Sequence, residues 1–159
     1  MKTIWYGDFP LGRFGLAEED GAITHLLLPT TPEPAGCTQG ETPLLREAAR
    51  QLKEYFAGRR RAFDLPLSPR GTAFQRRVWE ALQAIPYGET CTYKDLAIAV
   101  GSPKGFRAVG MANHCNPIAI FIPCHRVVGT NGSLTGYAGG LDMKAALLRL
   151  ERDSLSSGK

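Results

Sequence analysis

Apolar stretches and turn signals alternate over the first 30 residues, a pattern that predicts a small antiparallel sheet. The stretches TIWYG, FPLGRFGLAEEDG and AITHLLLP follow one another, with a turn expected at Glu19-Asp20-Gly21. Residues 31–43 are rich in Pro, Gly and Thr and are expected to form a loop. From Leu44 to Phe56 apolar residues recur at helical spacing, and Gly58 follows as a stop signal, so an amphipathic helix is predicted.

Helical patterns dominate beyond residue 69. Thr72 can cap a helix whose apolar residues share one face, namely Phe74, Val78, Trp79 and Leu82. Thr92 or its neighbour can cap YKDLAIAV, Gly101-Ser102-Pro103 turns the chain, and GFRAVGMANH follows as a second short helix. Two short helices around a Gly-containing turn are typical of a helix-turn-helix, although helical hairpins without a DNA partner share this pattern.

The last third of the chain is predicted from five shorter patterns. NPIAIFIP is an apolar, strand-like run, and CHRVVG is interpreted as a turn or a short helical start. TNGSLTGYAGG is a glycine-rich hairpin or loop, LDMKAALLRLE a closing helix, and DSLSSGK a disordered tail. The predicted class is α+β: a sheet-and-helix domain over 1–68, a mainly helical domain over 69–153, and a disordered tail over 154–159.

Composition indicates a soluble protein with its own core. The 159 residues are 43% hydrophobic and 21% charged, and no apolar run approaches the roughly 18 residues of a membrane span. The N-terminus lacks the pattern of a signal peptide, so a cytoplasmic location is expected. The cysteines form no C-x-x-C pair and match no zinc spacing, so reduced thiols and no metal site are expected; they are Cys37, Cys91, Cys115 and Cys124.

Positive charge is concentrated in the second half of the chain. Residues 1–68 hold 8 basic and 9 acidic side chains, whereas residues 69–159 hold 11 and 6. This surplus fits a polyanion partner such as nucleic acid, and it equally fits an ordinary solubilising surface. The run Arg59-Arg60-Arg61 could contact phosphate, but a solvated cluster beyond a helix C-terminus is the preferred interpretation.

Pro123-Cys124-His125-Arg126 is the segment with the clearest potential for chemistry. A cysteine is nucleophilic as its thiolate, which a nearby imidazole or the cation of Arg126 would favour. In an extended segment Cys124 and His125 would point to opposite faces, so a direct hydrogen bond needs a turn and a bridging water is the alternative. Taken alone, the dipeptide also fits a buried cysteine beside a surface histidine.

The sequence around this segment resembles that of the O6-alkylguanine-DNA alkyltransferase family. NPIAIFIPCHRVVG, the loop GYAGGL and the run KAALLRLE all match, and the core I-P-C-H-R-V-V is very specific to that family. Upstream, IPYGETCTYKDLA and RAVGMANHCNP extend the likeness to about residues 72–152. Over residues 1–68 only the order of elements is similar. The resemblance implies an RNase H-like N-terminal domain and a winged-helix-like C-terminal domain.

The resemblance also implies an activity. It indicates direct-reversal DNA repair, in which an alkyl group moves irreversibly from O6-alkylguanine in duplex DNA to Cys124, with activity on O4-alkylthymine left open. No cofactor is expected because the damaged DNA is the alkyl donor. The implied protein is a monomer that acts once and binds duplex DNA through the minor groove.

Roles near the acceptor cysteine follow from the same resemblance. His125 would act through a water as the base for the thiol, and Glu151 would orient that imidazole. Asn116 would join the helix-turn-helix to the active-site segment. From the residues alone, Glu151 could instead be an exposed acid paired with an Arg, and Asn116 a simple Asn-Pro turn former.

Further positions would contact the DNA. Arg107 would insert into the base stack after the target nucleotide is flipped out, and Tyr93 would lie near the rotated phosphate and the flipped base. The carbonyls of Cys124 and Val127, the Tyr137 ring and the Ala138 N–H would surround the guanine. The alternatives are a phosphate contact or solvent-facing residue for Arg107 and core aromatics for Tyr93 and Tyr137.

Three other classes of protein are the alternatives, two of them disfavoured by sequence features and the third distinguished by its stoichiometry. A non-catalytic binder of alkylated DNA would lack the acceptor cysteine. A sequence-specific regulator would need long polar side chains on its second helix, where this chain has Phe106, Ala108, Val109 and Met111. A cysteine hydrolase would turn over repeatedly, so stoichiometry distinguishes it. His114 and Cys115 differ from the residues that are common in the family at these positions. This difference puts the affinity for DNA in question but not the alkyl transfer.

Overall fold

The N-terminal half is a mixed sheet covered by one helix in a computed structural model that describes residues 2–132, 134, 137 and 139–157. The elements are β1 (Lys2–Phe9), β2 (Gly12–Glu19), β3 (Ala22–Leu27), β4 (Cys37–Gln39) and α1 (Pro43–Phe56). The sheet order is β3-β2-β1-β4. The predicted antiparallel meander of β1, β2 and β3 is confirmed, and its turn places Asp20 and Gly21 at positive φ angles of 54° and 78°.

The predicted loop over residues 31–43 needs a correction. It contains β4, which pairs parallel to β1 and makes the sheet mixed rather than purely antiparallel. This strand could not be predicted from the sequence because Cys37–Gln39 is short and largely polar, and because it forms by pairing with the free edge of β1.

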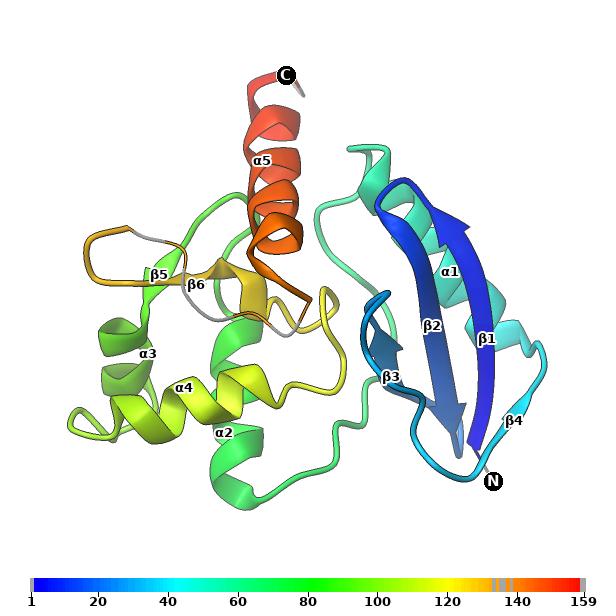
Figure 1. Cartoon of the computed structure of the whole chain (residues 1–159), viewed down its shortest axis with the longest axis horizontal. Helices are drawn as coiled ribbons and strands as arrows, with labels where there is room; N and C mark the ends of the chain where they lie inside the picture. The colour runs from blue at the N-terminus through cyan, green and yellow to red at the C-terminus, as the bar shows by residue number, and fades with distance from the viewer. Residues whose placement is uncertain (1, 133, 135–136, 138, 158–159) are drawn as a thin grey trace.

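α1 crosses one face of the sheet (Figure 1) because its apolar stripe matches the sheet's inner face. Thr42 caps the helix, since its hydroxyl accepts from the Leu45 N–H at 3.1 Å, and Pro43 occupies the first turn. The residues that α1 buries are Leu45, Ala48, Gln51, Leu52, Tyr55 and Phe56.

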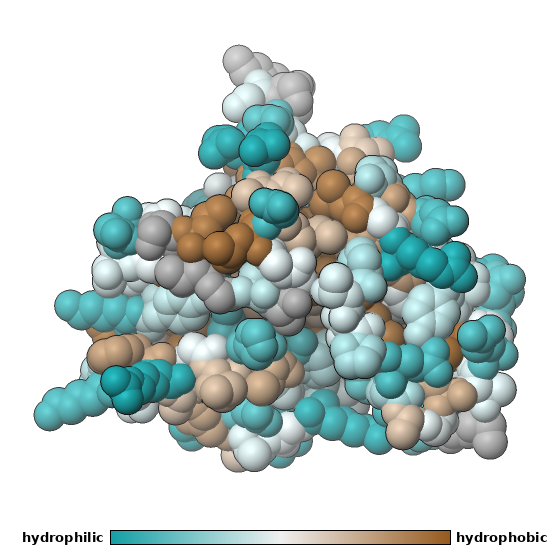
Figure 2. Space-filling model, viewed as in Figure 1, coloured by the Kyte–Doolittle hydropathy of each residue, from teal (hydrophilic) through white to brown (hydrophobic). Residues whose placement is uncertain are grey.

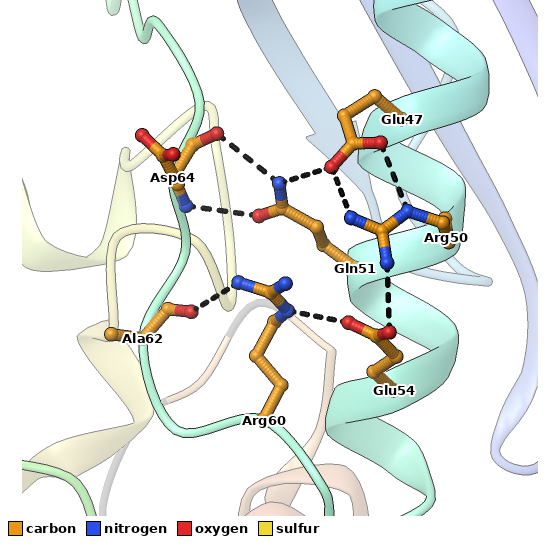
Figure 3. A network of polar contacts seen from close by, with 7 residues as sticks. All are labelled: Glu47, Arg50, Gln51, Glu54, Arg60, Ala62 and Asp64. Atoms are coloured by element: carbon orange, nitrogen blue, oxygen red, sulfur yellow. Dashed lines mark hydrogen bonds and ion pairs between the residues drawn. The ribbon is translucent and has the colours of Figure 1, made fainter.

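Polar contacts hold the chain that leaves α1 (Figure 3). The Gln51 side chain donates to the Asp64 carbonyl at 3.1 Å and accepts from the Asp64 N–H at 2.9 Å. Arg60 donates to Glu54 at 2.7 Å and to the Ala62 carbonyl at 3.0 Å. The preferred interpretation of the arginine run as a solvated cluster is therefore wrong for Arg60, which folds back onto the protein.

The C-terminal half is mainly helical (Figure 1). Its elements are α2 (Ala73–Gln83), β5 (Cys91–Thr92), α3 (Tyr93–Ala99), α4 (Phe106–His114), the 3-10 turn η1 (Cys124–Arg126), β6 (Val127–Val128) and α5 (Leu141–Ser157). Thr72 and Thr92 cap α2 and α3 as predicted, each within a capping box. Gly101, at a φ of 77°, makes the turn between α3 and α4. The Trp79 indole donates to the Ala112 carbonyl at 2.8 Å and ties α4 to α2.

Two predictions for this half are wrong. Residues 116–123 form successive turns rather than a strand, with isolated bridges at Ala119↔Ile122 and Leu26↔Ile118. The residues of this segment are apolar because they are buried in the core, not because they form a strand. The tail predicted as disordered from residue 154 continues α5 to Ser157, where Leu155 packs against Gly88. Tertiary contact thus extends a helix whose end carries no apolar periodicity.

The two halves share one hydrophobic core. A single cluster of buried side chains runs from Phe14 and Leu16 of the sheet through Tyr55 to Ile118, Cys124 and Leu147. Figure 2 shows hydrophobic residues gathered around α5 on one face, with hydrophilic residues along the rim. Among the described helices, none has the length and apolar character needed to cross a membrane. The shared core fixes the active-site segment against the N-terminal half.

Candidate active site

Cys124, His125 and Arg126 form the buried 3-10 turn η1, which follows Pro123. Their exposed fractions are 5%, 0% and 6%. The segment therefore turns at the cysteine, as a Cys-His interaction requires. The alternative of a surface histidine is wrong, because His125 is fully enclosed.

The Glu151 carboxylate is the centre of this site. Its Oε2 lies 2.7 Å from His125 Nε2 and accepts from Arg126 Nη2 at 3.0 Å and from the Tyr55 hydroxyl at 2.6 Å. Its Oε1 accepts from Arg126 Nε at 2.8 Å and from the Gly88 N–H at 3.0 Å. The predicted Glu151–His125 contact is present in the structure, whereas the interpretation of Glu151 as an exposed acid is wrong, because the residue is fully buried.

These contacts set the protonation states of the pair. Burial would raise the pKa of Glu151, but the hydrogen bonds and charges of His125 and Arg126 outweigh it and lower the pKa. For His125, burial is the larger effect and lowers its pKa in spite of Glu151. With Glu151 ionised and His125 neutral, the imidazole is prepared to accept a proton.

Cys124 rests as a thiol. Burial raises its pKa, while a hydrogen bond from Asn116 and the nearby charge of Lys144 lower it in part. The thiol therefore needs a base before it can act as a nucleophile.

Lys144, and not Arg126, is the cation that acts on the cysteine. Arg126 donates to Glu151 and, at 2.7 Å, to the Ile85 carbonyl, whereas the charge of Lys144 lowers the pKa of the Cys124 thiol. Lys144, which is fully buried on α5, was not predicted from the sequence. Its position two turns before Glu151, on the apolar face of that helix, was the available signal.

Asn116 spans the turns before the cysteine. Its Nδ2 donates to the Ile122 carbonyl at 2.7 Å, and its Oδ1 accepts from the Ile118 N–H at 3.0 Å. Both interpretations of this residue are thus compatible: it forms the turn before Pro117, and it holds the active-site segment in register.

A cavity of about 270 Å³ opens beside Cys124 at the junction of the two halves. This volume is near the lower end of the roughly 300–1,000 Å³ of small-molecule sites. The lining includes Cys124, Asn116 and Tyr137, together with Leu26, Leu28, Pro32, Asn113 and His114. Within the described part of the chain, Asn113 Oδ1 at this cavity and Nδ1 of His125, next to Cys124 in the chain, are buried without a hydrogen-bond partner, whereas the Tyr137 hydroxyl pairs with Cys124 itself.

Asn113 is a second buried residue at the site that the sequence did not predict. It is 3% exposed and its Nδ2 makes a long hydrogen bond of 3.4 Å to the Cys124 carbonyl, which also accepts from the Val127 N–H. An asparagine near a helix C-terminus is common, so the sequence offered no signal for its position beside the cysteine.

The other residues predicted to contact DNA differ in burial and in the elements that carry them. Tyr93 is half-buried at the start of α3, and its ring lies 5.8 Å from Lys144 Nζ and against Gly110 of α4. Val127 is buried in β6, and Arg107 is exposed on α4. Ala138 lies outside the described residues. The structure therefore brings Tyr93 to the site through Lys144, while Arg107 points to an outer surface.

The described residues contain no group of three or more His, Cys, Asp or Glu side chains that could hold a metal ion. The four cysteines are free, and Cys124 is the buried one among them. The arrangement supports proton transfer and nucleophilic attack by a thiolate.

Known proteins of one family are similar to this chain along both of its halves. Residues 3–69 match the family described as 6-O-methylguanine DNA methyltransferase, ribonuclease-like domain, and residues 73–153 match the 6-O-methylguanine DNA methyltransferase, DNA binding domain. A constitutive methylated-DNA–protein-cysteine methyltransferase of Bacillus subtilis is 54% identical, over 97% of this chain and 98% of that protein.

Two further relatives agree. A methylated-DNA–protein-cysteine methyltransferase of Methanosarcina barkeri is 62% identical over 69% of this chain and 70% of its own length. The crystal structure of Mycobacterium tuberculosis OGT in complex with DNA superposes with a TM-score of 0.91 at 45% identity, covering 96% of this chain and 94% of that one. The similarity therefore extends over both halves.

Proposed function

The chain belongs to the 6-O-methylguanine DNA methyltransferase family, and from this membership we propose that it repairs alkylated DNA by moving the alkyl group from guanine O6 to Cys124. The observation that carries the proposal is the buried Cys124-His125 turn held against Glu151. A thiol with a base beside it and a carboxylate that fixes the base is the arrangement that thiolate chemistry needs.

The proposed reaction begins with removal of the thiol proton. His125 donates its Nε2–H to Glu151, so its Nδ1 is the acceptor, and a water carries the proton from Cys124 to it. The thiolate then attacks the alkyl carbon, and the S–C bond forms as the C–O6 bond breaks. The electron pair of the broken bond passes to the guanine, which takes up one proton, so that the proton lost by Cys124 balances the reaction.

The product explains why each molecule acts once. The thioether on Cys124 is not displaced by water or thiols at neutral pH. The amount of repaired guanine therefore equals the amount of protein. No cofactor enters this scheme, because the DNA supplies the alkyl group and the protein supplies the acceptor and the base.

For DNA binding, we propose that α4 enters the minor groove of the duplex and that the target nucleotide is flipped toward Cys124. Arg107, exposed on α4, fills the vacated space, and Tyr93 lies beside the flipped nucleotide. The Tyr137 ring and the Val127 carbonyl contact the base, together with the Ala138 N–H. The protein acts as a monomer in the cytoplasm, with O6-alkylguanine as its substrate and O4-alkylthymine as a second one to be tested.

Intact mass spectrometry tests the proposed function. The protein is incubated with excess duplex DNA containing one O6-methylguanine and then mapped by peptide analysis. One added methyl group on Cys124, with product equal to protein, is expected. Cys124→Ala should transfer nothing yet still bind the damaged duplex, whereas Cys115→Ala, at an exposed thiol, should transfer as the wild type does. An unmodified wild-type protein would leave damage binding without transfer as its role.

The role of Arg107 is tested with two substrates. Arg107→Ala should slow transfer from duplex DNA by about 10- to 100-fold, because flipping costs a few kcal/mol that the arginine offsets. A single-stranded oligonucleotide needs no such compensation and should react at nearly the wild-type rate. Equal losses on both substrates would assign Arg107 to phosphate binding instead. The ratio of the two rates is the quantity to measure.

A further inference from the structure

Tyr55 connects the N-terminal half to the chemistry of the C-terminal half. It lies on α1, is fully buried, and donates its hydroxyl to Glu151 Oε2 at 2.6 Å across 96 residues of chain. The same oxygen lies 2.7 Å from His125 Nε2. Tyr55 and His125 therefore share one carboxylate oxygen. None of the sequence patterns pointed to this tyrosine, which looks like an ordinary member of the apolar face of a helix.

The Tyr55 ring is held firmly in place. Its centroid lies 5.5 Å from Phe56, 5.5 Å from Phe63 and 6.2 Å from Tyr87. On the same face of α1, one turn earlier, Gln51 is bonded in both directions to the Asp64 backbone (Figure 3). The hydroxyl is thus aimed at Glu151 by rigid packing, which is what an orienting group requires.

We propose that Tyr55 is a positioning residue of the transfer reaction: its hydroxyl holds Glu151 in the orientation that presents His125 to Cys124, so the N-terminal half completes the active site. This inference rests on the proposed function above. Burial and the neighbouring Glu151 carboxylate raise the pKa of Tyr55 well above its usual value, so the phenol remains a donor throughout the working pH range.

Removing the hydroxyl should change the proton affinity of His125. Glu151 Oε2 would then have one donor fewer, and its charge would act more strongly on the imidazole. The other groups that act on His125 are Arg126 of its own turn and Lys144 of α5, with Cys124 adjacent in the chain, and none of these changes. Because protonated His125 cannot accept the thiol proton, the acidic limb of the rate profile should move to higher pH.

The test compares Tyr55→Phe with Tyr87→Phe. Both variants lose one phenol oxygen in the same aromatic cluster, but the Tyr87 hydroxyl has no hydrogen-bond partner among the described residues. Single-turnover transfer is measured from pH 5.5 to 9, with damaged-duplex affinity measured in parallel. Tyr55→Phe should transfer roughly 10- to 100-fold more slowly, as expected for a partner that orients a functional imidazole, with affinity unchanged and the acidic limb at higher pH. Tyr87→Phe should match the wild type.

A second readout is independent of transfer. Nitrogen chemical shifts of ¹⁵N-labelled histidine in the free protein report the tautomer and titration of His125. In the wild type, the Tyr55 hydroxyl proton should exchange slowly and resonate downfield, which tests the contact even if Tyr55→Phe does not fold. Absence of that resonance from the wild type, or identical His125 titration in the folded variant and the wild type, would overturn the inference. A wild type that titrates as expected but transfers nothing would instead overturn the proposed function alone.

Discussion

The two sides of the Cys124-His125 turn differ in how their polar groups are satisfied. Behind the turn, Glu151 receives hydrogen bonds from three different segments, through Tyr55, Gly88 and Arg126, besides its contact with His125. In front, at the cavity, the buried side-chain oxygen of Asn113 lacks a partner among the described residues, and the Tyr137 hydroxyl is paired with the Cys124 thiol itself. A carboxylate paired from several sides gives rigidity, whereas an unpaired buried polar group costs free energy that a ligand can offset. The rear of the site is therefore built for support and the front for binding.

The largest effect should come from breaking the rear cluster. Glu151→Ala leaves the Arg126 guanidinium buried without its counter-charge, and we expect a loss of about 3–5 kcal/mol in the free energy of unfolding. Urea denaturation measures it. The control is Asp8→Ala, which removes a well-exposed partner of Arg13 and should cost less than about 1 kcal/mol. Similar losses in both variants would mean that the rear cluster contributes no special support.

Acid should destabilise the protein through the groups at the rear of the site. Folding holds the pKa of Glu151 below its usual 4.5 and that of His125 below its usual 6.5, so the unfolded chain binds more protons than the folded one in acid. The contribution of these two groups to the free energy of unfolding should therefore be complete above about pH 6.5. It should decrease below that pH and decrease more steeply below about pH 4.5, by about 1.4 kcal/mol per pH unit for each extra proton that the unfolded chain binds.

Thermal unfolding between pH 3 and 8 measures this dependence. His25 adds to the upper part of the fall, because burial lowers its pKa to about 4, and a His25→Gln variant separates its contribution. In Glu151→Gln the steep fall below pH 4.5 should become shallower. An unchanged slope in that variant would place the acid sensitivity elsewhere in the molecule.

The smallest effect should come from the cavity side. Asn113→Leu keeps the branched shape and the number of heavy atoms of the side chain and removes an unpaired oxygen and one long hydrogen bond, so we expect a change of less than about 1 kcal/mol in the free energy of unfolding. Asn116→Leu, three residues later, loses two short hydrogen bonds and should cost about 1–3 kcal/mol. If Asn113→Leu were the costlier of the two, the front of the site would be a structural element and not a binding surface.

Local chemistry explains which elements could be predicted from the sequence. Thr72 and Thr92 cap their helices, and the Asp20-Gly21 turn forms, because each depends on neighbours within a few residues. The prediction of a strand over 116–123 was wrong, because a run of apolar residues indicates burial but does not indicate the backbone conformation. β4 was missed because its pairing depends on β1, more than 25 residues away.

The sequence by itself determined the nucleophile segment, its family and the caps and periodicities that build the helices. Only the tertiary structure decided what surrounds the nucleophile. Tyr55 and Glu151 meet across 96 residues, and Lys144 rather than Arg126 acts on Cys124, since packing of the shared core sets which charges are close. Short-range propensity is encoded by neighbours in the chain, whereas hydrogen bonds and buried charges depend on distances that exist only after the two halves have packed together.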